Sequence, residues 1–150
     1  ENQIEKALEH SLIAKSEKPQ GPLVHYNLGV IYTKKKDYSL AIQAYEEELL
    51  QEEVYPLTYR NLGLLYKEQE DFQKAKRIYL EGIHLLDDAT LWYNLACVYA
   101  LEKDYNNTYE ALLLALRKNF NLLDDVKQDC ELKLFRATQL FQDLLHFYQE

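Results

Sequence analysis

The stretch Tyr26-Asn27-Leu28-Gly29-Val30-Ile31-Tyr32 decides the fold, because it returns twice later in the chain. The second copy is residues 59–66 (YRNLGLLY), and the third is residues 92–99 (WYNLACVY). Gly63 follows Gly29 after 34 residues, and Ala96 follows Gly63 after 33. An aspartate followed by an aromatic residue returns at the same step, at residues 37–38, 71–72 and 104–105. Two markers with one period predict a repeat architecture.

The composition favours one helical domain and excludes some classes of partner. The 150 residues are 47% hydrophobic and include only 4 glycines and 3 prolines, which is typical of packed helices. A net charge of -8 argues against a nucleic-acid-binding surface. The sequence has no apolar run of about 18 residues, so we expect no insertion into a membrane. Because the chain does not begin with methionine, we expect it to be a piece of a longer protein.

Apolar residues at helical spacing, separated by turn residues, predict seven helices before residue 120. Pro22 stands where the first turn of a helix tolerates proline, and Asp37 and Asp88 are suited to capping the helices that follow them. Small residues at Gly29, Gly63 and Ala96 would let paired helices approach closely. The predicted helices cover residues 2–16, 23–34, 38–52, 57–68, 72–86, 89–101 and 105–118.

These markers together resemble the tetratricopeptide repeat. The resemblance implies an all-α fold, a right-handed α-solenoid of antiparallel helix pairs with C-terminal capping helices. It divides the single domain 1–150 into a half repeat at 1–21, repeats at 22–55, 56–88 and 89–121, and a cap at 122–150. His25 and Glu48 depart from the family pattern.

Residues 129–132 (DCEL) precede a Phe-x-x-Leu-Leu pattern at residues 141–145. This order resembles a closing segment of bacterial repeat proteins, which favours a bacterial source. A solenoid leaves its last apolar face bare, and a terminal helix must cover it. We expect six apolar side chains to do so: Leu134, Phe135, Leu140, Phe141, Leu144 and Leu145.

The resemblance also implies a concave groove lined by the first helix of each repeat. Asn27, Asn61 and Asn94 recur at one register, where their amides could hold the main chain of a peptide or bond a neighbouring helix. Basic residues in the groove favour an acidic ligand, although a solvated face would have the same composition. The predicted peptide-binding residues are Tyr26, Asn27, Val30, Lys34, Arg60, Asn61, Leu64, Lys67, Tyr93, Asn94 and Cys97.

The sequence contains no pattern that indicates catalysis. The four histidines are scattered, and neither Cys97 nor Cys130 belongs to a metal-binding or redox motif. We therefore predict a protein that is not an enzyme, with no cofactor and no metal site. The predicted function is binding a protein or peptide segment in the groove. The alternatives are self-association through the N-terminal half repeat, or regulation within a longer protein. The sequence leaves the compartment open between cytoplasm and periplasm.

Overall fold

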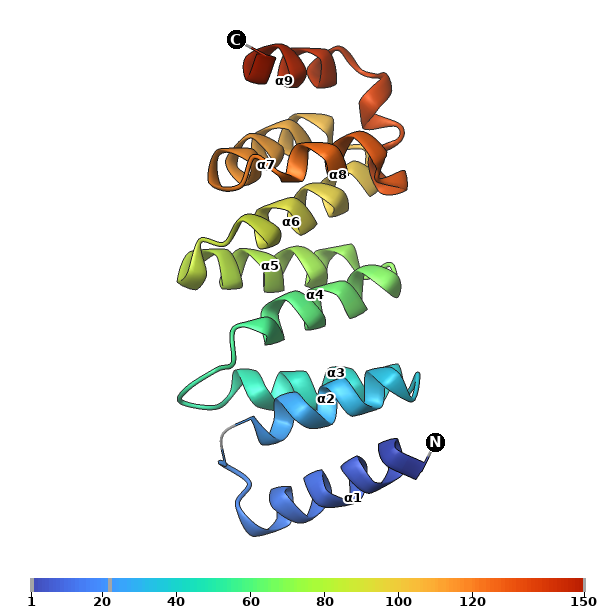
Figure 1. Cartoon of the computed structure of the whole chain (residues 1–150), viewed down its shortest axis with the longest axis vertical. Coiled ribbons are helices and arrows are strands. Elements are labelled where there is room, and N and C mark those ends of the chain that lie inside the picture. Colours follow the sequence, from blue (N-terminus) through green and yellow to red (C-terminus); the bar gives the residue numbers. More distant parts are fainter. Residues whose placement is uncertain (1, 22, 150) are drawn as a thin grey trace. The chain divides into compact units, whose positions relative to one another are not determined.

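The regular structure in the part of the chain that is described is helical (Figure 1). The computed structural model describes residues 2–21 and 23–149, so the expectation for Pro22 lies outside the described residues. The chain forms two compact units, residues 1–65 and residues 66–150.

Unit 1 contains α1 (Asn2–Glu17), α2 (Val24–Lys34), α3 (Tyr38–Leu49) and most of α4 (Leu57–Glu68). The predicted helices match these bounds closely, except that α3 ends three residues before the predicted residue 52. The helix α2 packs against both α1 and α3. Val24, Leu28 and Ala44 form a small buried cluster there, to which Leu8 and Ala14 of α1 add partly buried contacts.

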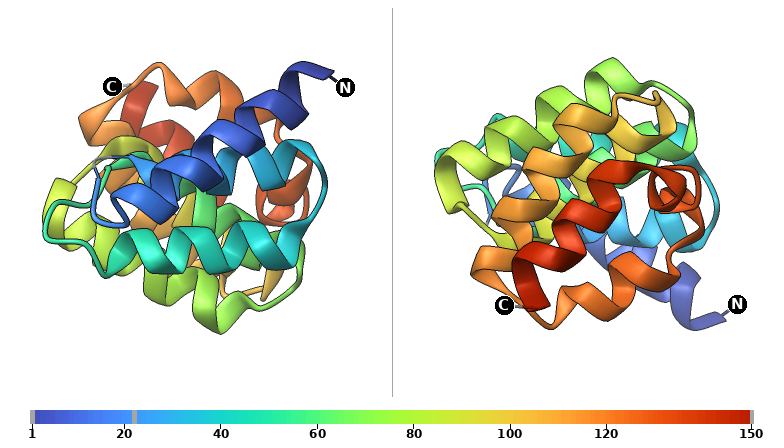
Figure 2. Two further views of the ribbon diagram at one scale, coloured as in Figure 1. Left: turned by 90° about the horizontal axis from the view of Figure 1, so that it is seen from below. Right: turned by 90° about the horizontal axis from the view of Figure 1, so that it is seen from above.

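Unit 2 contains the end of α4, then α5 (Phe72–Leu86), α6 (Ala89–Leu101) and α7 (Tyr105–Lys118). The short α8 (Leu122–Gln128), two 3-10 turns, η1 (Cys130–Leu132) and η2 (Phe135–Ala137), and α9 (Gln139–Gln149) follow. The view from above in Figure 2 shows this terminal part in orange and red. The helix α6 packs against α5 and α7, and α9 packs against α7.

The three turns that precede α3, α5 and α7 share one hydrogen-bond pattern. The backbone N–H groups of Asp37, Asp71 and Asp104 each donate to the carbonyl of the tyrosine five residues earlier, at 2.9 Å. The residue before each aspartate has a positive φ between 59° and 62°. This left-handed residue ends one helix, and the aspartate carboxylate accepts a backbone N–H of the next helix.

The first helix pair depends on the missing side chain of Gly29. A Cβ atom there would lie 2.5 Å from Cε1 of Tyr45, well inside van der Waals contact. Tyr45 is 1% exposed, so its ring has little freedom to move away. The small residue at this register therefore makes room for the tyrosine of the paired helix.

Glu48, which departs from the family pattern, has a structural role at the end of α3. It is 2% exposed, and its two carboxylate oxygens accept the backbone N–H groups of Tyr26, at 3.2 Å, and Tyr55, at 3.0 Å. Leu23, at the start of α2, offers no side-chain cap. Glu48 therefore caps α2 from a neighbouring helix and fixes the loop that leads to α4.

The terminal segment contributes much of the core of unit 2. Val126, Leu132, Phe135 and Leu144 are each 0% exposed, and all four pack in the cluster that contains Ala96 of α6. Phe141 belongs to the same cluster, and Leu140 and Leu145 pack against it. Leu134 does not: it is 56% exposed, so its predicted burial is wrong. It precedes η2, whose turn places Phe135 inward instead.

Replacing Gly29 with alanine tests the role of this contact. Glycine to alanine within a helix ordinarily stabilises by about 0.5–1 kcal/mol. Here we expect a net loss of about 1 kcal/mol or more in the free energy of unfolding, because the new methyl group overlaps the Tyr45 ring. Urea denaturation of Gly29→Ala measures the change. In a Tyr45→Leu background the same substitution should no longer destabilise; an equal cost in both backgrounds would contradict the proposed clash.

Candidate functional site

The structure distributes the predicted groove residues over both units. Seven of them lie in unit 1, on α2 and the first two turns of α4: Tyr26, Asn27, Val30, Lys34, Arg60, Asn61 and Leu64. We call these seven residues the α2–α4 face. The other four, Lys67, Tyr93, Asn94 and Cys97, lie in unit 2.

An aromatic cluster underlies the α2–α4 face. The Tyr26 ring lies 5.9 Å from the Tyr45 ring and 4.5 Å from the Tyr55 ring, measured between centroids. Nδ2 of Asn61 donates to the Tyr45 hydroxyl at 3.3 Å and lies 3.5 Å from the Tyr26 hydroxyl. Burial raises the pKa of Tyr45, so its hydroxyl keeps its proton near neutral pH.

The asparagines therefore differ in their surroundings. Asn61 bonds to tyrosines of its own unit, which is one of the two roles that the sequence left open. Asn27 is exposed, and its amide is available to a ligand. Asn94 is half-buried.

The α2–α4 face carries two exposed cations, Lys34 and Arg60. Within residues 2–21 and 23–149, neither side chain takes part in an ion pair. Leu64, beside Arg60 on the same helix face, is 41% exposed, and Val30 is half-buried. The face thus combines apolar surface with positive charge in a chain whose net charge is -8.

In unit 2 the chain itself covers the corresponding positions. Residues 129–132 lie against α6, where the Tyr93 hydroxyl donates to Oδ2 of Asp129 at 2.6 Å. Nζ of Lys67 donates to both carboxylate oxygens of Glu131, at 2.6 and 2.8 Å. Lys67 and Tyr93 are thereby engaged by two acidic side chains of the same polypeptide.

The acidic segment is firmly held. Oδ1 of Asp129 accepts the backbone N–H of Glu131 at 2.9 Å and so shapes η1. The Arg136 guanidinium donates to the carbonyl oxygens of Val126 and Asp129. Leu132, next to Glu131, is fully buried in the core cluster.

Cys97 lies beneath this segment rather than on a ligand-accessible surface. It is 2% exposed, and its Sγ lies 3.8 Å from Oδ2 of Asp129. Burial, with the negative charge of Asp129 beside it, raises the pKa of the Cys97 thiol. Burial and the hydrogen bond to Asp129 also raise the pKa of Tyr93. Both groups are therefore held in their protonated, weakly nucleophilic forms.

Cys97, Asp129 and Glu131 also form a set of possible metal ligands, with one ligand atom from each within 4.8 Å of the others. The Lys67 ammonium already neutralises part of this charge by binding both oxygens of Glu131. A metal ion at this set would have to displace both the thiol proton of Cys97 and the Lys67 ammonium.

Comparisons with known proteins agree with this architecture. Tetratricopeptide-repeat family models match residues 22–47 and residues 58–85. No curated protein sequence matches the chain. The MamA RS-1 ArsTM double mutant is similar in structure, with 15% sequence identity and a TM-score of 0.73 over 99% of this chain and 86% of that one. YrrB, described as "a TPR protein with an unusual peptide-binding site", shares 16% identity and gives a TM-score of 0.69 over 99% and 85% of the two chains.

The chain therefore contains tetratricopeptide repeats and has an all-α solenoid fold. In general terms it is a protein-interaction module, and its fold is typical of scaffolds without catalytic activity. Among the described helices, none has the length and apolar character required to cross a bilayer.

Sequence reasoning missed the residues that cover unit 2. The pattern Asp-x-Glu-Leu at residues 129–132 indicated only that the segment belongs to the cap. Its two acidic side chains, which bind the predicted groove residues Lys67 and Tyr93, were not assigned a role. The available signal was charge: Asp129 and Glu131 follow a repeat array whose groove positions include a lysine and a tyrosine.

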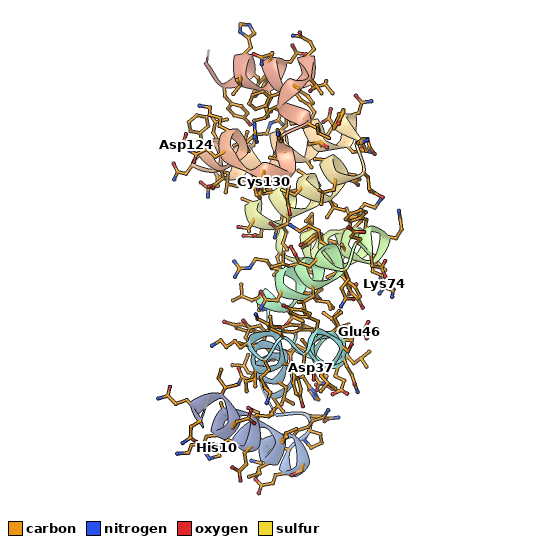
Figure 3. All side chains as sticks on the ribbon, turned by 90° about the vertical axis from the view of Figure 1, so that its right-hand side faces the viewer. His10, Asp37, Glu46, Lys74, Asp124 and Cys130 are labelled. Carbon is orange, nitrogen blue, oxygen red and sulfur yellow. The ribbon has the colours of Figure 1, made fainter. Side chains whose placement is uncertain are left out.

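The two cysteines should differ sharply in reactivity. Cys130 is exposed and is labelled in Figure 3, whereas Cys97 is buried with a raised pKa. Treating the folded chain with iodoacetamide should modify Cys130 and spare Cys97, as followed by mass spectrometry of peptides. Tyr93→Phe removes the hydroxyl that holds Asp129 and should accelerate labelling of Cys97. Tyr38→Phe, an exposed change in unit 1, should not. Equal rates at the two cysteines would contradict the burial of Cys97.

The raised pKa of Cys97 also predicts a pH dependence. In the folded chain the pKa of the Cys97 thiol lies above its unfolded-state value, which is near 9.0. The thiol therefore contributes fully to the free energy of unfolding below this pH, and the contribution is lost as the pH rises further. Urea denaturation at pH 7.5 and pH 9.5, followed in unit 2 by Trp92 fluorescence, should show a smaller pH-dependent loss for Cys97→Ala than for the parent chain. Identical losses would contradict a neutral thiol in the folded state.

Proposed function

We propose that the α2–α4 face is the ligand-binding surface and that it binds a protein or peptide segment. One contrast carries the proposal. In unit 1 four side chains of the face are exposed, and its two cations have no ion-pair partner among the described residues. In unit 2 the chain's own residues 129–132 engage Lys67 and Tyr93 and bury Cys97. A preformed helical surface with unpaired polar groups is suited to binding without rearrangement.

Each part of the face has a role in this proposal. Tyr26, Val30 and Leu64 offer aromatic and apolar contact, the kind of anchor that dominates binding energy. The Asn27 amide supplies a donor and an acceptor for a ligand main chain. Asn61 acts indirectly, because its bond to Tyr45 orients the aromatic cluster below.

Charge favours a carboxylate-bearing ligand. Lys34 and Arg60 have no acidic partner among the described residues, so a ligand carboxylate would gain hydrogen bonds without displacing an existing ion pair. The guanidinium of Arg60 is suited to binding a carboxylate through two parallel hydrogen bonds.

Self-association through α1 is the alternative, and one observation favours it. The helix α1 contributes no buried residue, and its neighbouring Leu12 and Ile13 are 44% and 46% exposed. In this alternative a second copy of the chain would cover these side chains.

A capture experiment separates the two. The chain is immobilised beside the variant Arg60→Glu/Leu64→Ser and incubated with a lysate of the source organism. We expect the parent to retain a partner that the variant loses at least tenfold, because both substitutions change exposed side chains of the face.

The matched control is Arg77→Glu/Leu80→Ser on α5. It exchanges the same residue types at exposed positions, with Leu80 45% exposed. A partner retained equally by both variants would place binding elsewhere and overturn the proposal. Light scattering of the parent and of Leu12→Ser/Ile13→Ser tests the alternative, which requires a dimer that this variant abolishes.

A further inference from the structure

The segment 129–132 binds to α4 and α6 of its own chain as a separate peptide ligand could. Its two carboxylates are spaced two residues apart and bind different helices: Asp129 binds Tyr93 of α6, and Glu131 binds Lys67 of α4. The next residue, Leu132, is fully buried. The segment thus crosses from the first helix of one repeat to the first helix of the repeat before it.

The repeat period relates the residues of unit 2 that contact this segment to residues of unit 1. A step of 33 residues relates Tyr93 to Arg60 and Cys97 to Leu64, and a step of 34 relates Lys67 to Thr33. A segment bound one repeat earlier would therefore place its first carboxylate at Arg60 and its second near Thr33 and Lys34.

At the first of these positions the side chain is a better carboxylate partner than in unit 2, and at the second Lys34 supplies the cation beside Thr33. Arg60 carries a charged fork of donors where unit 2 has a single tyrosine hydroxyl. Lys34 follows Thr33 directly, and the Thr33 hydroxyl already donates to the Gly29 carbonyl at 2.8 Å. Leu64, 41% exposed, replaces the buried Cys97 and leaves apolar surface beside the first carboxylate site.

We propose that the α2–α4 face binds an acidic segment with two carboxylates two residues apart followed by an apolar residue, running from α4 towards α2 as residues 129–132 run from α6 to α4. This inference rests on the proposed function and specifies its ligand. The ligand is an internal chain segment, because the carboxylates of Asp129 and Glu131 are side chains and no chain terminus takes part.

The chain's own sequence provides the probe. A fluorescent peptide of residues 127–134, with Cys130→Ser to prevent oxidation, is titrated with the whole protein and followed by anisotropy. We expect saturable binding. A peptide with Asp129→Asn and Glu131→Gln should bind at least tenfold more weakly, because each charge-assisted hydrogen bond is lost. The protein variant Arg60→Glu should cause a similar loss, whereas Arg77→Glu should not.

The peptide has a second potential site, since it could replace the resident segment in unit 2. The protein variant Tyr93→Phe separates the two sites, because the unit 2 site uses Tyr93 and the α2–α4 face does not. Binding that responds to Tyr93→Phe and ignores Arg60→Glu overturns the inference. Equal binding of the acidic and amidated peptides also overturns it.

A random peptide library selected on the protein distinguishes failure of this inference from failure of the proposed function. Selected peptides that need Arg60 and Leu64 and share the spaced acidic pattern support both. Selected peptides that need these residues and carry no acidic pattern overturn the inference and leave the proposed function standing. A selection in which no peptide depends on the face overturns both.

Discussion

The contact between the Tyr45 ring and the bare backbone of Gly29 is the constraint on which unit 1 depends. The ring occupies the space that a Cβ atom at residue 29 would fill, so the distance between α2 and α3 is set by the thickness of an aromatic ring. The buried ring then presents its hydroxyl to Asn61 of α4 and packs at a tilt against the Tyr26 ring. A single missing side chain thereby positions the residues beneath the α2–α4 face. A packed aromatic cluster loses little freedom when a ligand binds above it, which lowers the entropic cost of association.

The helices could be predicted from the sequence because their signals are local. Four of them, α4 to α7, begin and end at the predicted residues, where capping aspartates or prolines coincide with the apolar period. The capping of α2 could not be predicted, since it depends on Glu48 reaching Tyr26, 22 residues away. The left-handed residues Lys36, Glu70 and Lys103 also carry no local signal, because neither glycine nor asparagine stands at these positions. Their conformation follows from the paired helices that the turn must join.

The candidate site, too, could be predicted from the sequence only in part. The resemblance to the repeat family predicted that Tyr26, Val30 and Arg60 lie on one face of the first helices; on α2 and α4, Arg60 is exposed and Tyr26 and Val30 are half-buried. The spacing of residues along a helix could not indicate which helix faces other segments of the chain would cover. That outcome depends on Glu131 meeting Lys67, 64 residues earlier, and on Leu132 and Phe135 finding space in the core. The capping segment also contains the carboxylates of Asp129 and Glu131. These carboxylates contact Lys67, Tyr93 and Cys97 and hold them within the folded structure. Binding of a ligand by these residues remains a prediction, as it does for the α2–α4 face.

The resident segment also determines where an external ligand can compete. A tethered segment acts at an effective concentration in the millimolar range, so a free ligand with the same contacts is at a large disadvantage in unit 2. Burial of Leu132 and Phe135 increases that disadvantage, because displacing the segment would expose both side chains to water. The α2–α4 face has no such competitor among the described residues. The net charge of -8 slows the approach of an acidic ligand at long range, but screening confines this repulsion to about 8–10 Å at physiological salt. Within that distance the ligand meets Lys34 and Arg60, so the overall charge limits the rate of association more than it weakens the final contacts.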